Sequence, residues 1–543
     1  MTLVLSVPNL SARNPDEMEL QPPQVKKWLE DLPLLNIAET SRKLLSTLSI
    51  HNRVEFDGTL RLQLLELFRY PVNQISLELA KQYIGQPLPL SEKHKTIAEL
   101  NRQLRMEMAY GYKRLVLNRA DKGGDRKELA TTALTIQRAI CCLTDVLAVS
   151  YQTYSPDPPE TWKEIHTLYT HAEALKLADV EVDDPLNKTL SRSKISHVYK
   201  QALLLDFSDP FHLPPRMIDR VQHYLDRWAS LAHLTGVPPT YNPTCQFLID
   251  REKDRAGIVY TAETLLDAHS PPYRLLNTVE LARLAHTQLT LLKNGQPPPP
   301  EGLQENFYQE NGLELLKRVI SAWGVNPQRN FRRSHRSGHQ VDIAVGLDAI
   351  NYWINGGKKF VVSSNFVGPL PQRTQLGIEE KKPAAARMSE REYSTWDVED
   401  ESAGGLALSK TGQINVPVHV GDLVITRPPG IGSAWSVGVI RWVKSAASSN
   451  VDIGIQHLAP SAEPAVIKTV SEKKIESDFL PALLLPEIKP LKQPQTLLAQ
   501  RGICKAGAEI FMDNGYRLSR IAPTRLVETS HSFEQFSFDI LNS

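Results

Sequence analysis

The amino-acid sequence predicts a multidomain α + β protein, in which an all-α helical N-terminal domain precedes an antiparallel β-barrel with extra C-terminal β strands. Three observations lead to this prediction. Apolar residues recur with a helical period up to Trp323, short segments with a period of two follow, and four successive prolines lie shortly before the change. With 543 residues, the chain is long enough for several domains that each bury a core of their own.

Helical periodicity dominates the first 300 residues. In LRLQLLELFRY, the apolar residues Leu62, Leu65 and Phe68 recur at helical spacing. Proline-rich segments such as YSPDPPETW and GVPPTYNPT interrupt the pattern, because proline disfavours a continuing helix. We therefore expect an array of helical hairpins. Beyond the apolar runs at 44–48 and 62–68, the expected helices lie near residues 75–85, 96–118, 126–152, 159–177, 190–205, 215–235, 257–269, 277–293 and 310–323.

The segment NGQPPPPEG, residues 294–302, is the best candidate for a linker between domains. Its four prolines favour an extended polyproline conformation that acts as a semi-rigid spacer. One amphipathic helix follows, and its apolar stripe is explained most simply as core packing. The stripe consists of Leu313, Leu316, Val319, Ile320 and Trp323. We therefore expect a helical domain at residues 1–300 and a linker with an amphipathic helix at residues 301–326.

Short β-branched segments separated by Gly, Asn and Ser turns follow Trp323, which favours a small antiparallel barrel or sandwich. We expect this barrel at residues 327–460, with an insertion near residues 366–392. A C-terminal β extension is expected at residues 461–543. It forms either a second small β unit or additional strands on the first barrel.

Alternation within one of these segments, SVGVIRWV, predicts which side chains share a face of the barrel. In a regular strand, Val437, Val439, Arg441 and Val443 lie on one face and Trp442 lies on the other. Valines that alternate with tryptophans in this way fit the packing of a barrel wall.

Charge and targeting signals restrict the partners and the compartment. The chain has 62 basic and 61 acidic side chains, a net charge of +1, so any anion site must be local. The N-terminus lacks the positive region of a signal peptide, and no run approaches 18 apolar residues. These features predict a cytoplasmic protein without a membrane span.

The cysteines and the catalytic motifs give no support to an enzyme or a metal protein. Only four cysteines occur, and no CxxC motif joins them. GxxxxGK[ST], GxSxG and HExxH are absent as well. His335 and His339 are four residues apart, but no carboxylate pattern surrounds them. We expect no catalytic residue, no cofactor and no metal.

An arginine cluster precedes the first expected strand. In NPQRNFRRSHRSG, Arg329, Arg332, Arg333 and Arg336 fall within eight residues without an acidic neighbour. Guanidinium groups suit bidentate contacts with phosphate oxygens or with guanine O6 and N7, and they stack on purines. On its own, such a cluster also fits a solvated basic loop.

A second motif follows at the end of an expected strand. The run TWDVEDESAGGLALSK places Asp400, Ser402 and Gly405 in the pattern DxSxxG. Residues two apart in an extended chain face the same side, so the carboxylate and the hydroxyl point together. The carboxylate suits the N1–H and N2–H donors of guanine, and Gly404 and Gly405 permit positive φ and a close backbone approach. A turn with an Asx-type hydrogen bond explains the same residues without a ligand.

The two motifs, in this order and before alternating strands, resemble the PilZ domain. The resemblance covers about 130 residues, from Pro327 to Leu458, and includes WSVGVIRWVKSAASSNVDIGIQHL. It implies a six-stranded antiparallel barrel that binds the bacterial second messenger cyclic di-GMP. The helical half resembles no family that its residues identify.

The resemblance also implies roles for the motif residues. Two arginines spaced RxxxR would contact the phosphates and the Hoogsteen edges of guanine, and Asp400 and Ser402 would meet a base from the barrel surface. Both Arg329 with Arg333 and Arg332 with Arg336 have this spacing. We favour the first pair, with Arg332 as an additional phosphate contact. The candidate ligand-binding residues are Arg329, Arg332, Arg333, Asp400, Ser402 and Gly405.

One feature departs from the PilZ pattern. Sixty-three residues separate Arg336 from Asp400, where a strand hairpin needs far fewer. A surface insertion of this kind costs little entropy, because the cost of closing a loop grows slowly with its length. The insertion provides either a partner site or an obstacle to the ligand.

Two other functions remain open at this stage. A ligand-free scaffold with a degenerate barrel would fit the large helical half, which has an unknown protein partner in either interpretation. A barrel with Trp435, Trp442 and Phe511 also suits the stacking of single-stranded nucleic acid. The near-neutral charge and the lack of a basic stripe argue against nucleic acid. The expected function is therefore that of a cyclic di-GMP receptor that transmits binding to the helical domain.

Overall fold

The computed structural model covers most of both halves of the chain. It describes residues 3–11, 21–119, 125–187, 189–237, 244–261, 264, 272–301, 303–309, 311–324, 334–335, 338–362, 392–412, 414–430, 434–445, 450–471, 474–475, 479–488, 493–505 and 507–541.

The chain forms two compact units. The first, called the helical unit, comprises Met1–Gln86 and Leu90–Gln328. The second, called the β unit, comprises Pro87–Pro89 and Arg329–Ser543. Leu88 joins the β unit through an antiparallel bridge to Val418.

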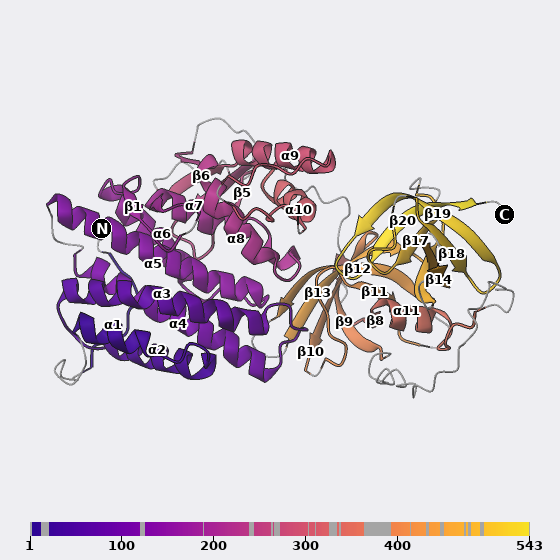
Figure 1. The fold of residues 1–543 in the computed structure, drawn as a ribbon, viewed down its shortest axis with the longest axis horizontal. Coiled ribbons are helices and arrows are strands. Elements are labelled where there is room, and N and C mark those ends of the chain that lie inside the picture. The colour runs from indigo at the N-terminus through magenta and orange to yellow at the C-terminus, as the bar shows by residue number, and fades with distance from the viewer. Residues whose placement is uncertain are drawn as a thin grey trace. The chain divides into compact units, whose positions relative to one another are not determined.

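Ten α-helices are present in the described part of the helical unit (Figure 1). They are α1 (Pro22–Glu30), α2 (Ile37–His51), α3 (Gly58–Tyr83), α4 (Glu92–Leu117), α5 (Arg126–Gln152), α6 (Thr161–Ala174), α7 (Ile195–Asp206), α8 (Met217–Trp228), α9 (Val279–Lys293) and α10 (Gly312–Gly324). Two short 3₁₀ helices, η2 (Pro210–His212) and η3 (Ala229–Leu231), flank α8.

Side-chain caps fix the starts of the three longest helices. Asp57, Ser91 and Asp125 each accept a hydrogen bond from backbone N–H groups in the first turn of α3, α4 and α5. In α5, the Glu128 side chain also accepts from the Asp125 backbone, which completes a capping box. These caps satisfy backbone donors that a helix leaves unpaired at its N-terminus.

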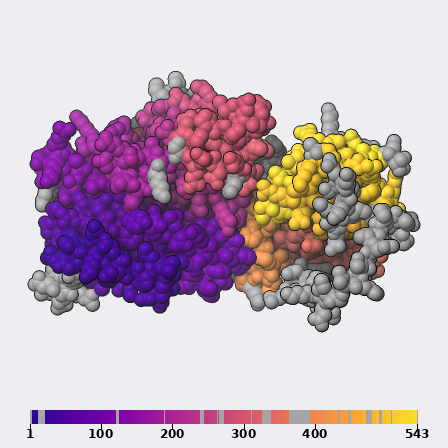
Figure 2. All heavy atoms as spheres, viewed as in Figure 1, coloured from indigo at the N-terminus to yellow at the C-terminus, as the bar shows by residue number. Residues whose placement is uncertain are grey.

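The three long helices α3, α4 and α5 lie side by side and carry much of one continuous core (Figure 1). Large side chains such as Trp162 of α6 and Trp323 of α10 are completely buried in it. Figure 2 shows the atoms of the helical unit closely packed on the face that it displays. Leu316, Val319 and Trp323 of the α10 stripe are therefore core, as their spacing predicts, whereas Leu313 at the start of the helix is 41% exposed.

The helical unit also contains two small sheets. A hairpin pairs β1 (Glu181–Asp183) with β2 (Arg192–Lys194). A four-stranded sheet has the order β3-β6-β4-β5. Its strands are β3 (His233–Thr235), β4 (Gln246–Asp250), β5 (Ile258–Val259) and β6 (Tyr273–Asn277).

These strands correct the expectation of helices alone, although the predicted α + β class is confirmed. The expected helix at 257–269 is wrong where the structure describes it, because Ile258 and Val259 pair with Leu248 and Phe247 as a strand. Strands of two to five residues are too short for alternation to be distinguished from helical spacing.

The first barrel of the β unit is closed. Its strands run in the order β10-β13-β12-β11-β8-β9, and β9 pairs with β10 to complete a ring of six, while β7 pairs with the C-terminal end of β9. The strands are β7 (Ser334–His335), β8 (Gln340–Val345), β9 (Ser394–Ser402), β10 (Gly405–Thr411), β11 (Leu423–Arg427), β12 (Ser436–Ser445) and β13 (Asn450–Ala459). All of these pairs are antiparallel.

The C-terminal residues form a second closed barrel, so they make their own β unit and do not extend the first sheet. The order is β14-β16-β17-β20-β19-β18, closed by the pair β14–β18, with β15 beside β14. The strands are β14 (Glu463–Ser471), β15 (Lys474–Ile475), β16 (Leu480–Leu485), β17 (Thr496–Ala499), β18 (Glu509–Asp513), β19 (Leu518–Thr529) and β20 (Glu534–Leu541).

A short helix, α11 (Leu347–Ile354), links the two barrels. Its buried Asn351 donates hydrogen bonds of 2.8 and 2.9 Å to the carbonyl oxygens of Ala465 and Ala482 in the second barrel. Ile350 of the same helix lies in an apolar core that both barrels share. Part of the extra length between Arg336 and Asp400, INYWINGG at residues 350–357, therefore contacts both barrels, whereas residues 366–391 of the expected insertion lie outside the described residues.

One helix of the described residues, α5, is long and apolar enough to cross a membrane. Its apolar window is 72% buried inside the structure, as in the core helix of a folded domain. A single helix of this kind is a weak indication of a membrane span.

Candidate functional site

The predicted arginines lie outside the described part of the chain. None of Arg329, Arg332, Arg333 and Arg336 is among the described residues, so their roles stay predictions. The other three predicted residues, Asp400, Ser402 and Gly405, lie together on the hairpin that connects β9 and β10.

The hairpin turn is tight. Ser402 and Gly405 are Cα partners, so only Ala403 and Gly404 form the turn between them. The hydroxyl of Ser402 donates a 3.3 Å hydrogen bond to the carbonyl oxygen of Gly405. The serine therefore holds the end of the hairpin closed, and its oxygen keeps lone pairs for a further donor.

Gly405 is required for a reason that the sequence did not reveal. Its φ lies outside the left-handed region, so the expected use of positive φ is wrong at this position. Instead, a Cβ atom there would lie 2.0 Å from the carbonyl oxygen of Ile455 in the neighbouring strand β13. Glycine allows the two backbones to approach this closely.

A β-bulge turns Asp400 toward the outside of the barrel. Val398 pairs with Leu408 and Asp400 pairs with Ala407, which leaves Glu399 as an extra residue. Cross-strand partners share a face of the sheet, and successive residues of β10 alternate. Asp400 therefore lies on the face opposite to the fully buried Leu408. Bulges commonly redirect side chains next to functional sites.

Four neighbouring strands place one row of residues on this outer face. The row consists of Asp400 on β9, Ala407 on β10, Gly454 on β13 and Trp442 on β12, each paired with the next. The indole of Trp442 lies across Gly454, because a Cβ atom on that glycine would be 1.9 Å from Trp442 Nε1. An aromatic ring thus shares the face that carries the candidate carboxylate.

Sequence reasoning placed Trp442 opposite Val443 correctly, but it missed the bulge that separates Val443 from the face of Val439. Simple alternation gives Val439, Arg441 and Val443 one common face, but a second bulge lies between Ile440 and Trp442. Val443 pairs with the buried Ile453, while Trp442 pairs with Gly454 on the outside. The usable signal was Gly454 itself, since a glycine inside a strand often marks a close approach.

Strand β7, which directly follows Arg333 in the sequence, pairs with the end of β9 at the hairpin. Ser334 pairs with Glu401 and His335 pairs with Asp400. Arg333 directly precedes Ser334 in the chain. The backbone pairing therefore joins the two predicted motifs, which are more than sixty residues apart in the sequence, at one edge of the barrel.

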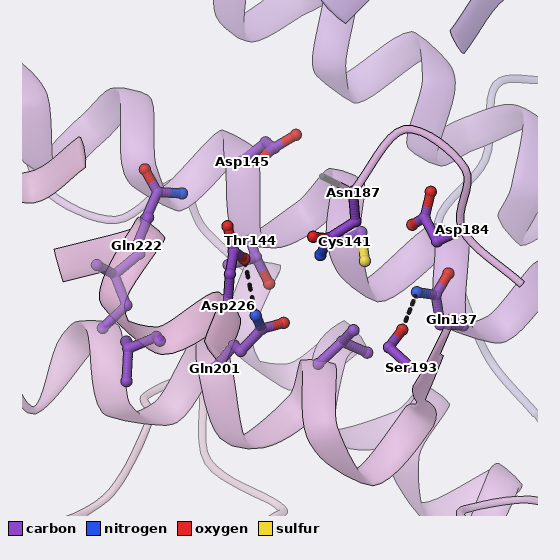
Figure 3. A pocket seen from close by; sticks show the side chains of 13 residues that line it. Gln137, Cys141, Thr144, Asp145, Asp184, Asn187, Ser193, Gln201, Gln222 and Asp226 are labelled. Carbon is purple, nitrogen blue, oxygen red and sulfur yellow. Dashed lines mark hydrogen bonds between the residues drawn. The ribbon is translucent and has the colours of Figure 1, made fainter. Parts of the chain in front are cut away.

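A separate polar cavity lies in the helical unit (Figure 3). Its volume is about 100 Å³, and burial raises the pKa of two carboxyl groups in its wall, Asp145 and Asp226. Gln201 donates to Asp226, and Gln137 donates to Ser193, both at 2.9 Å. Ligand pockets typically measure about 300–1,000 Å³, so this cavity suits a few water molecules rather than a dinucleotide.

Comparison with protein-family models gives three matches that follow one another along the chain. Residues 23–240 match the N-terminal domain of the cyclic-di-GMP receptor FimW. Residues 246–367 and 363–464 match its middle PilZ domain, and residues 465–541 match its C-terminal β-barrel domain. The middle match begins in the small sheet of the helical unit, upstream of the barrel itself.

The chain is therefore a PilZ-domain protein with a second barrel, which confirms the resemblance drawn from the two motifs. More specifically, it belongs to the FimW family, since the three domain models of that family together span residues 23–541. A relative named cyclic-di-GMP receptor FimW, from Pseudomonas aeruginosa strain PAO1, is 27% identical over 584 aligned positions. The alignment covers 99% of this chain and 93% of the relative. No solved structure matches the chain.

Proposed function

We propose that this chain is a receptor for cyclic di-GMP, and that the dinucleotide binds at the edge of the first barrel where β7 meets β9. The pairing of Ser334 and His335 with Glu401 and Asp400 carries the proposal, because it joins the arginine segment to the DxSxxG hairpin. The match to the PilZ domain of a protein named as a cyclic-di-GMP receptor supports it.

In this proposal the Asp400 carboxylate recognises the guanine base. Asp400 faces outward, and its side chain is only partly buried, so it is accessible to a ligand. A carboxylate accepts from N1–H and N2–H of guanine, whereas adenine offers no such pair of donors. Ser402 on the same face would contact the same base or hold the hairpin in place.

The arginines would bind the charged part of the ligand. Chain connectivity keeps Arg333 within one residue of β7, a Cα spacing of about 3.8 Å. Arg329 and Arg333 would contact phosphate oxygens and the O6 and N7 atoms of guanine, with Arg332 as a further phosphate contact. The indole of Trp442 offers a surface on which a base could stack from the same outer face.

The helical unit would receive the signal. Helix α10 ends at Gly324, a few residues before the arginine segment. Binding would tie that segment to the barrel and so restrict the connection to the helices. We further propose that the protein works in the cytoplasm, catalyses no reaction and acts through a protein partner rather than nucleic acid.

A calorimetric titration of the full-length protein with cyclic di-GMP tests this function, with GTP and cyclic di-AMP as controls. The expected result is saturable binding that is selective for cyclic di-GMP. Circular dichroism on the same sample establishes that the protein is folded. Folded protein that binds none of the three nucleotides would contradict the proposal and favour a ligand-free scaffold.

A further inference from the structure

Two histidines and an aspartate from both barrels meet at one point in the β unit. His419 and Asp422 lie in the turn before β11, and His531 lies in the turn between β19 and β20. Nε2 of His531 is 3.0 Å from Oδ1 of Asp422, and Nδ1 of His419 is 3.4 Å from Oδ2. One ligand atom from each residue lies within 4.8 Å of the other two.

Hydrogen bonds hold the Asp422 side of this cluster in place. The backbone N–H of His419 donates to Oδ2 of Asp422 at 2.7 Å. The backbone groups of Gly421 and Asp422 pair with Ile440 at 2.7 and 2.9 Å, which fixes the turn on β12. The carboxylate is therefore oriented by the first barrel before any ligand arrives.

The second barrel holds His531 against the same turn. The Ser532 hydroxyl donates to the carbonyl oxygen of Gly421 at 2.9 Å. Gly421 has a φ of +94°, and a Cβ atom there would lie 3.1 Å from Nδ1 of His531. Phe533, two residues after the histidine, is completely buried in the core that both barrels share. The close packing of the two turns thus positions all three side chains.

The donor set and its spacing suit a divalent transition metal. Zinc binds histidine nitrogen and carboxylate oxygen at about 2.0–2.2 Å, so neighbouring ligands of a tetrahedral site lie roughly 3.4 Å apart. The separations of the two histidine nitrogens from Asp422, 3.0 Å to Oδ1 and 3.4 Å to Oδ2, are close to that value, although they end on different carboxylate oxygens. Calcium and magnesium prefer all-oxygen sites, which two imidazoles do not provide.

The exposure of the three side chains also fits an ion site with an open side. The Asp422 side chain is 12% exposed and that of His419 is 20% exposed, whereas His531 is 41% exposed. An ion would enter from the side of His531, and water would complete its coordination.

We propose that His419, Asp422 and His531 bind one Zn²⁺ ion, or a chemically similar divalent transition metal, and that this ion clamps the two barrels together. Two ligands come from the PilZ barrel and one from the C-terminal barrel, so binding links elements more than 100 residues apart. None of the three belongs to the proposed dinucleotide site, so the two proposals stand or fall separately.

The test uses full-length protein from which any affinity tag has been removed and metal has been stripped with a chelator. Zn²⁺ is titrated in competition with a chromophoric chelator, and Co²⁺ is added to a second sample to record its visible absorption. We expect one ion per chain, the intense bands of four-coordinate cobalt, and a higher unfolding temperature with Zn²⁺ because only the folded chain presents all three ligands.

Two variants make the test specific. His531→Ala changes a partly exposed side chain and should weaken Zn²⁺ binding at least about 10-fold, with loss of the thermal shift. His286→Asn, on the exposed side of α9, is the matched control and should behave like the wild type. No saturable binding by the wild type, or equal binding by His531→Ala, would overturn the proposal. In that case the histidines hold Asp422 by hydrogen bonds alone.

Discussion

At the scale of single residues, backbone irregularities decide which side chains face a ligand. Without the extra residue Glu399, the strand would direct Asp400 to the same side as the buried Trp396 and Val398. Likewise, without the bulge at Arg441, Trp442 would lie on the same side as the buried Ile440. The sequence identified Asp400 and Ser402 through their spacing, but it could not show the bulges, because these depend on pairing with another strand.

Replacing Asp400 with alanine should weaken guanine recognition. A lost hydrogen bond to a charged group costs about 1.5–3 kcal/mol, so the affinity for cyclic di-GMP should fall roughly 10- to 100-fold. The preference over cyclic di-AMP should shrink with it. The matched control is Asp397→Ala, because Asp397 lies on the same strand and the same outer face and already bonds to Gln340. Calorimetry with both ligands measures the effect, and an unchanged preference in Asp400→Ala would contradict the assigned role.

The buried His51 should make the helical unit sensitive to acid. Burial, together with the nearby Arg61 charge, lowers the pKa of His51 to about 4, from an ordinary value of 6.5. Between pH 6.5 and pH 4, the unfolded chain therefore binds a proton at His51 more readily than the folded chain does. The stability contributed by the neutral ring is complete above pH 6.5 and is lost as the pH falls from 6.5 toward 4.

The test compares the wild type with His51→Gln, which removes the titrating group. Between pH 7 and pH 5.5, the wild type should lose about 1 kcal/mol more unfolding free energy than the variant. Urea unfolding at the two pH values measures the difference, and His286→Gln should track the wild type. Parallel pH profiles for wild type and His51→Gln would show that His51 does not contribute.

At the scale of elements, periodicity predicted the long helices well and the short elements poorly. The expected helix at 126–152 coincides with α5, whose repeated apolar residues and capping box at Asp125 are both local signals. Strands β3 to β6 have two to five residues and pair across tens of residues, so they carry no comparable signal. The second barrel was one of two open alternatives, because closure by β14 with β18 is a long-range property.

Helix α11 gives part of the extra length between Arg336 and Asp400 a structural role. Asn351→Ala removes two buried hydrogen bonds to the second barrel and leaves two carbonyl oxygens without these donors. We expect a loss of about 1–3 kcal/mol in the unfolding free energy of the β unit. Asn355→Ala, at the exposed end of the same helix, should cost less than about 1 kcal/mol. Chemical unfolding measures both variants, and equal effects would contradict an inter-barrel role for Asn351.

At the scale of the whole molecule, the order of the three domains carries the functional argument. The PilZ barrel stands between a helical domain and a second barrel, in the order of the FimW domains. The net charge of +1 gives no general attraction for anions, so a ligand with two phosphates requires a local cluster. The arginine segment is the densest such cluster in the sequence, and β7 joins it to Asp400.

The cluster of His419, Asp422 and His531 forms only through the tertiary structure of the two barrels. His531 lies more than 100 residues after Asp422, and no spacing pattern in the sequence connects them. Only the packing of one barrel turn against the other brings their side chains together. A short spacing between histidines, such as that of His335 and His339, therefore could not reveal this cluster.

The central claim is that the arginine segment and the Asp400 hairpin form one site for cyclic di-GMP. The most direct test is calorimetric titration of this dinucleotide into the full-length wild type, the double variant Arg329→Ala/Arg333→Ala and the control Arg517→Ala. Each bidentate arginine contact contributes about 1–3 kcal/mol, so the double variant should bind at least about 30-fold more weakly. The control alters an exposed arginine of the second barrel and should leave the affinity unchanged. Wild-type affinity in both this double variant and the alternative pair Arg332→Ala/Arg336→Ala would contradict the account.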